Sequence, residues 1–102
     1  MENAKELISS EWFDKVLSDA GFFNEDNPYP ASQYGMIKFL EIKNIKIFHY
    51  KRDNGWMYVG IDTSEDDDFT QDFNVYEDFD TCVDTSIVEC MCYLANNLKH
   101  ND

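Results

Sequence analysis

Carboxylates are the residues whose number and spacing most strongly suggest chemistry in this chain. Between residues 62 and 84 the sequence holds ten acidic residues and no Lys or Arg. A block of like charges repels itself and costs stability, so a small protein does not need such a block in order to fold. Two interpretations stay open: a solvated loop that keeps the protein soluble, or a binding surface for a basic partner. The acids of this segment are Asp62, Glu65, Asp66, Asp67, Asp68, Asp72, Glu77, Asp78, Asp80 and Asp84.

A calcium-binding loop is the first specific chemistry to test against this segment. Asp62, Ser64 and Asp66 have the spacing of the first three ligands of an EF-hand. The sixth position of that loop requires Gly but holds Asp67, and the twelfth requires a bidentate Glu but holds Phe73. We therefore predict no calcium site here.

Histidine and cysteine are the other candidates for catalysis. A cysteine–histidine nucleophile would need His49 to meet a helix cysteine and a third orienting group, so we favour a strand histidine without a catalytic role. Cys90 and Cys92 stand two residues apart in a predicted helix, about 200° apart around its axis, and cannot easily share a metal ion. With Cys82 the cysteines number three, and we expect reduced thiols in a cytosolic protein, with a Cys82–Cys90 disulfide as the alternative. No carboxylate pair and no Gly-rich phosphate loop stands out, so we predict a protein that is not an enzyme, without metal or cofactor.

The composition of the whole chain further limits the class of protein and the kinds of partner. With 102 residues and 43% hydrophobic residues, we expect one domain over 1–102 with its own core. The chain is too short for a barrel enzyme or a full dinucleotide-binding fold. A net charge of −13 argues against binding nucleic acid or an anionic membrane. The first six residues lack a positive region followed by an apolar stretch, so we expect no signal peptide and a cytoplasmic location.

The elements that must position these residues follow from hydrophobic periodicity. Residues 3–20 predict a helix with one broad apolar stripe, and Gly21 stands where a left-handed C-terminal cap would lie. Residues 22–34, with two prolines, predict an irregular connection. A last helix is expected over 86–99, where Ser86 and Glu89 have the spacing of a capping box.

Residues 36–62 predict a three-stranded antiparallel meander. Asn54–Gly55 is a strong signal for a hairpin turn, which would set Arg52 opposite Met57, and Lys43–Asn44 could make a second tight turn. The face that we expect to pack on the helices holds Ile37, Phe39, Phe48, Tyr50, Met57, Val59 and Ile61. The opposite face holds Lys38, Leu40, Ile42, Ile45, Ile47, His49, Lys51, Trp56 and Tyr58.

A slip of one residue in register would exchange these two faces. On the second face, Trp56 and Tyr58 are either covered by the last helix or form an exposed interface. The segment 62–84 would then be an acidic connection, with a short further strand at 73–76. The predicted fold is a two-layer α+β domain: N-terminal helix, three-stranded antiparallel meander, acidic loop and C-terminal helix.

The distribution of charge suggests what the acids could do. An extended run over 65–68 would place one negative charge about every 3.3 Å, close to the about 3.4 Å between phosphates along one DNA strand. Five of the eight bases fall in the first two predicted strands, so we expect an electrically polarised surface. Those bases are Lys38, Lys43, Lys46, Lys51 and Arg52.

In size, acidity and layout, the chain resembles small phage anti-CRISPR proteins and other DNA-mimic inhibitors. The resemblance rests on no motif. It implies a protein that blocks the nucleic-acid site of a basic effector, such as a CRISPR nuclease complex. The alternatives are an immunity protein that neutralises a basic toxin, and a structural or regulatory module that self-assembles, which could include a homodimer. The residues that we expect to bind the partner are Asp62, Glu65, Asp66, Asp67, Asp68, Asp72, Glu77, Asp78, Asp80, Trp56 and Tyr58.

Overall fold

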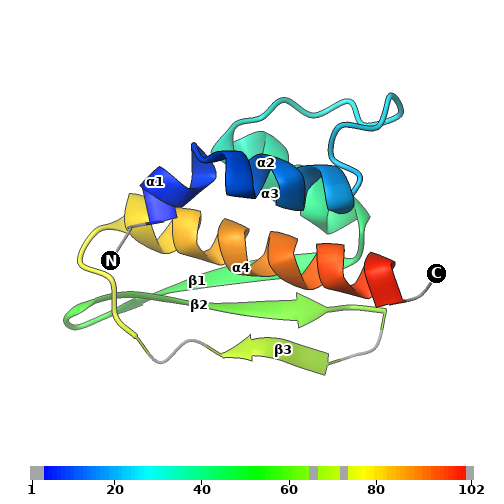
Figure 1. The fold of residues 1–102 in the computed structure, drawn as a ribbon. Coiled ribbons are helices and arrows are strands. Elements are labelled where there is room, and N and C mark those ends of the chain that lie inside the picture. The colour runs from blue at the N-terminus through cyan, green and yellow to red at the C-terminus, as the bar shows by residue number, and fades with distance from the viewer. Residues whose placement is uncertain (1–3, 65–66, 72–73, 101–102) are drawn as a thin grey trace.

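The computed structural model describes residues 4–64, 67–71 and 74–100, and for 67–71 and 99–100 it describes the backbone. It is an α+β fold in which a long C-terminal helix lies between a sheet and a layer of shorter helices (Figure 1). The elements in chain order are α1 (Ala4–Ile8), α2 (Glu11–Asp19), α3 (Gln33–Ile42), β1 (Ile45–Arg52), β2 (Gly55–Asp62), β3 (Asp67–Gln71) and α4 (Phe79–His100).

Helix α4 organises the core. It contacts β1 and β2 on one side and α1, α2 and α3 on the other, so the molecule has three layers where the sequence predicted two (Figure 1). The core residues come from both helical layers and from the near face of the sheet. The largest fully buried apolar side chains are Phe13, Phe39, Leu40, Ile45, Tyr58, Ile87 and Met91.

The predicted helix over 3–20 is divided into α1 and α2 by a serine cap. The Ser10 Oγ accepts a hydrogen bond from the Phe13 amide at 3.2 Å and donates to the Leu7 carbonyl at 2.6 Å. Serine competes in this way with the helical hydrogen bonds, which ends one helix and begins the next. At the other end of α2, Gly21 adopts a φ of +84°, as its predicted role in a helix C-cap requires.

The first strand of the predicted meander is wrong, because residues 33–42 form α3. The helix begins at Ser32, whose Oγ accepts from the Gly35 amide at 3.1 Å, and ends before Asn44, whose φ is +71°. Met36, Phe39 and Leu40 are buried at helical spacing. A short apolar run of this kind fits the period of a helix as well as that of a strand, so periodicity could not separate them.

Of the three strands predicted over 36–62, two are found, and their register is shifted. Arg52 pairs with Gly55 and Tyr50 with Met57, so the turn residues are 53 and 54 rather than 54 and 55. The predicted pairing of Arg52 with Met57 is therefore wrong by two residues. Because the shift is even, the residues of these strands that share a face are the ones predicted.

The choice of the buried face is also reversed. Tyr58 is 2% exposed on the side covered by α4, whereas Phe48 and Tyr50, which we expected in the core, are 43% and 50% exposed on the other side. The alternative that the last helix covers Trp56 and Tyr58 is confirmed. The reason is that α4 offers hydrogen-bond partners to this face: Ser86 to His49, and Glu89 to Tyr58.

The acidic connection is more ordered than predicted. Strand β3 pairs antiparallel with β2, which gives the sheet order β1-β2-β3. Of the short strand expected over 73–76, Phe73 lies outside the described residues and Tyr76 forms an isolated bridge with Trp56. Helix α4 begins at Phe79, so Ser86 lies inside the helix, where its hydroxyl donates to the Val83 carbonyl instead of capping.

Candidate partner-binding surface

The predicted acidic segment follows one edge of the sheet. After β2 the chain turns back as β3 and then rises into α4, so this edge lies across β2 from β1 (Figure 1). Asp67 and Asp68 are the first two residues of β3, and Asp68 pairs with Ile61. Three predicted partner-binding residues, Glu65, Asp66 and Asp72, lie outside the described residues.

Three further predicted residues are exposed where the segment enters α4: Glu77, Asp78 and Asp80. Asp78 also caps the helix, because its Oδ1 accepts from the Thr81 amide at 2.6 Å. Hydrogen bonds from the Thr81 side chain and backbone lower the pKa of Asp78, with a smaller contribution from the charge of Lys5. The carboxylate is therefore held in its charged form. We call β3 together with 74–80 the acidic edge.

Asp62 belongs to the interior instead. It is 6% exposed; its Oδ1 accepts from the Ser64 amide at 3.0 Å and from the Ser64 hydroxyl at 2.6 Å, and its Oδ2 accepts from the Tyr93 hydroxyl at 2.6 Å. Asp84 is buried as well, and accepts from Gln33 at 2.7 Å. The predicted role of Asp62 in partner binding is corrected, because its carboxylate ties α4 to the sheet.

The two predicted aromatic anchors differ in exposure. Tyr58 is buried and its hydroxyl donates to Glu89, so it offers no surface to a partner and that prediction is also corrected. Trp56 is half-buried, with its ring 4.6 Å from that of Phe79 and the Lys51 ammonium 5.7 Å from its centroid. Trp56 therefore keeps part of its surface in contact with solvent.

His49 and Ser86 are close enough to resemble a catalytic pair. The His49 Nε2 lies 3.1 Å from the Ser86 Oγ. Ser86 is fully buried, however, and its hydroxyl is already hydrogen-bonded to the Val83 carbonyl. Burial lowers the pKa of His49, which holds the imidazole neutral. No substrate reaches this hydroxyl, so the pair is structural.

The cysteines are inert for a similar reason. No disulfide joins Cys82 and Cys90, and both are buried. Burial raises the pKa of the Cys90 thiol strongly, and it raises that of Cys92, with the charge of Glu89 adding to both. The thiolate is the nucleophilic form, so raised pKa values make both thiols unreactive near neutral pH.

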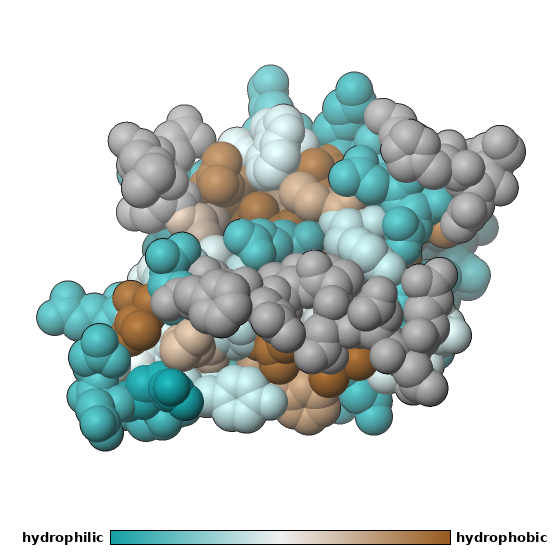
Figure 2. Space-filling view, turned by 90° about the horizontal axis from the view of Figure 1, so that it is seen from below, coloured by the Kyte–Doolittle hydropathy of each residue, from teal (hydrophilic) through white to brown (hydrophobic). Residues whose placement is uncertain are grey.

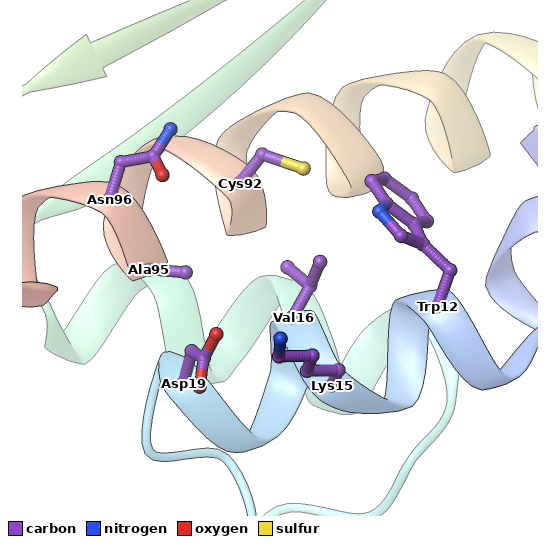
Figure 3. A pocket seen from close by; sticks show the side chains of 7 residues that line it. All are labelled: Trp12, Lys15, Val16, Asp19, Cys92, Ala95 and Asn96. Carbon is purple, nitrogen blue, oxygen red and sulfur yellow. The ribbon is translucent and has the colours of Figure 1, made fainter.

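A hollow lies between α2 and α4 (Figure 3). Its volume is about 300 Å³, and it is open to solvent. Lys15 and Asp19 stand one helical turn apart on its α2 wall, so their opposite charges offset one another. Sequence reasoning missed this hollow because it exists only once α2 packs beside α4. The lining residues are Trp12, Lys15, Val16, Asp19, Cys92, Ala95 and Asn96.

Acidic residues of the N-terminal helices add to the negative charge on the helical side of the molecule, where Lys5 of α1 is close enough to act on Asp78. Helix α1 packs against α4 and lies over its first turns (Figure 1). Glu6, Glu11 and Asp14 are exposed on α1 and on the first turn of α2. Sequence reasoning missed their contribution, because they lie more than sixty residues before α4.

The described residues form neither a metal site nor a membrane-spanning helix. Within the described part of the chain, no group of His, Cys, Asp and Glu side chains could hold a metal ion. None of the described helices is long and apolar enough to cross a membrane. Comparisons with protein-family models, with curated proteins and with solved structures found no match.

Proposed function

We propose that this protein is a non-enzymatic acidic inhibitor that binds a basic protein partner. The partner is a nucleic-acid-binding effector, such as a CRISPR nuclease complex, and the inhibitor occupies its nucleic-acid site. One observation supports this most directly: the acidic edge lies across the sheet from the bases of β1. Those bases are Lys46 and Arg52, whereas the ammonium of Lys51, the third base of β1, lies 5.7 Å from the centroid of the Trp56 ring.

The separation matters because it keeps the bases of β1 away from the acidic residues of β3, whereas Lys5 of α1 is a base that acts on Asp78. Strands β1 and β3 are two strand spacings apart, about 10 Å, which is at or beyond the Debye length of about 8 Å at physiological ionic strength. The bases on β1 are therefore largely screened from the acids of β3. On α3, Lys38 already pairs with Glu41 at 3.5 Å.

Two successive residues of the acidic edge, Asp67 and Asp68 of β3, are acidic. Successive residues of an extended strand are about 3.3 Å apart, close to the phosphate spacing of one nucleic-acid strand. A groove lined with Lys and Arg would attract such an edge by the forces that attract its own substrate. The exposed part of Trp56, near the edge, adds an aromatic contact that salt does not weaken.

The experiment that tests this proposal reverses charges on the edge while keeping the fold. Glu77 and Asp80 are exposed, and neither is the residue that caps α4. In Glu77→Lys/Asp80→Lys we expect partner binding to weaken about tenfold or more, because like charges would then face the basic groove. The matched control is Glu25→Lys/Asp26→Lys, which makes the same charge change in the exposed connection between α2 and α3.

The measurement is capture of partners on the immobilised chain from a bacterial lysate, followed by release with a DNA or an RNA oligonucleotide. We expect the captured protein to be basic, to be released by nucleic acid, and to be retained by the control variant. Equal capture by both charge-reversed variants would contradict the proposal. Capture that nucleic acid does not reverse would favour the immunity-protein alternative, in which the partner is a toxin bound outside its nucleic-acid site.

A further inference from the structure

The face of the sheet that points away from α4 is apolar at its centre, and none of the described helices covers it (Figure 1). All the described helices lie on the opposite side of the sheet (Figure 1). Phe48 and Tyr50 of β1 are 43% and 50% exposed, and Val75, beside the start of β2, is 36% exposed. Seen from below, apolar side chains gather on this face (Figure 2). We call the open face the set formed by Phe48, Tyr50, Met57, Val59, Ile61 and Val75.

Such a face is unusual for a sheet that meets water. The solvent side of an antiparallel sheet normally carries polar residues at alternate positions. Here the central positions of this face carry aromatic or aliphatic residues, paired across the strands as Phe48 with Val59 and Tyr50 with Met57. A contiguous exposed apolar patch of this kind marks an interface.

The charges that border the open face identify what covers it. On the β1 side, Lys46 and Arg52 share this face with Phe48 and Tyr50, and both are exposed. On the β3 side, the register sets Asp68 opposite Ile61. By register, the face therefore has a basic border of two residues on its β1 side, an apolar centre, and one acidic position, Asp68, as its acidic border on the β3 side.

We propose that a second copy of this chain packs on the open face, sheet against sheet, about a two-fold axis parallel to the strands. This axis sets the basic border of each copy against the acidic border of the other, so the surface is complementary to itself. An axis perpendicular to the strands would set each border against its own charge. The contact includes Asp68 and Val75 of the acidic edge, but it is argued from the apolar side chains of the open face, so the inference does not rest on the proposed function.

The size of the face sets the strength of the contact. Eight residues of strand extend about 26 Å, and three strands span about 14 Å, which gives about 400 Å² of flat surface in each copy. A stable interface buries about 800 Å² for each partner. We therefore expect a weak, reversible dimer with a dissociation constant in the micromolar range.

Sedimentation of the full chain between about 5 µM and about 500 µM tests the inference. We expect the dimer fraction to rise with concentration. In Phe48→Thr/Tyr50→Thr we expect the dissociation constant to rise at least tenfold, because both side chains lie in the contact. We expect the fold to be kept, because both side chains are already about half exposed to solvent and threonine is suited to strands. Phe23→Ser, which removes a 58% exposed aromatic from a connection, is the control and should leave the dimer unchanged.

The orientation is tested by charge reversal on β1. In Lys46→Glu/Arg52→Glu we expect weaker association, since two acidic borders would then meet. Lys5→Glu/Lys15→Glu makes the same charge change on exposed positions of α1 and α2 and should have a smaller effect. A chain that is monomeric throughout the concentration range, or a dimer that Phe48→Thr/Tyr50→Thr leaves intact, would overturn the inference. Tighter association of Lys46→Glu/Arg52→Glu would overturn the two-fold axis proposed here.

Discussion

His49 is a titratable side chain that the fold half-buries between β1 and α4, with its ring edge-on to Phe79 at 5.4 Å. Burial lowers the pKa of His49 below its ordinary value. Protonation therefore favours the unfolded chain. The stability that neutral His49 contributes is complete above the unfolded pKa of about 6.5 and is lost as the pH falls through the lower, folded pKa.

We therefore predict that the free energy of unfolding depends on pH less in His49→Gln than in the native protein. The measurement is urea denaturation at about pH 7.5 and at about pH 5, because the window of His49 lies below about pH 6.5. The difference between the two proteins isolates His49 from the many carboxylates that also titrate on acidification. If both proteins lost the same stability between the two pH values, the neutral state of His49 would not be a source of stability.

At the scale of elements, α4 is joined to the rest of the fold by polar contacts as well as by its apolar surface. Its Tyr93 donates to Asp62 at the end of β2, its Glu89 accepts from Tyr58 in the middle of β2, and its Asp84 accepts from Gln33 of α3. Hydrogen bonds to buried charged groups are worth more than neutral ones, and a buried carboxylate that loses its donor keeps its desolvation cost. The two contacts to β2 favour burial of the sheet face that carries Tyr58, and the Gln33 contact joins α4 to α3.

Tyr93→Phe tests this role directly. It removes one hydroxyl and leaves the ring, so the Asp62 Oδ2 loses the donor at 2.6 Å. We expect the free energy of unfolding to fall by about 1–3 kcal/mol, measured by urea denaturation near neutral pH. Tyr34→Phe, at a 68% exposed position on α3, is the matched control and should change stability little. Equal effects of the two substitutions would show that the Tyr93–Asp62 contact adds no stability.

At the scale of the whole molecule, the net charge of −13 acts against compactness. Long-range repulsion among like charges destabilises a folded protein, and salt screens it. The bases on α3 and β1 lie apart from the acidic edge, so they relieve this repulsion only locally. The negative charge that the proposed function uses therefore lowers the free energy of unfolding.

We predict that the melting temperature rises between about 10 mM and about 500 mM NaCl, by about 4–8 °C, which corresponds to about 1 kcal/mol for a domain of this size. Glu77→Lys/Asp80→Lys should reduce this rise, because it replaces two negative charges of the acidic edge by two positive ones. A melting temperature that falls with added salt would mean that attractive ion pairs, and not repulsion, dominate the electrostatics of the fold.

Local sequence patterns were enough to predict much of this architecture. The hairpin of β1 and β2, the set of residues that share each face, the C-cap at Gly21 and the run of acids after β2 all depend on neighbours within a few positions. A strand has a side-chain period of two, so an even shift of register left the faces intact although it changed every pair. The exposed carboxylates Glu77, Asp78 and Asp80 followed from composition alone.

Packing between distant segments decided the remainder. Residues 36–42 satisfy both the helical and the strand period, and α3 forms because its buried side chains meet α4 and β1. Both faces of the β1–β2 hairpin are apolar, so hydrophobicity could not select the buried one. The partners that selected it, Ser86, Glu89 and Tyr93, lie more than thirty residues further along the chain than the sheet residues they bind. Contacts over such distances arise only when the chain has folded. This is why the sequence predicts Asp62 and Tyr58 to bind a partner, and predicts the open face to pack in the core.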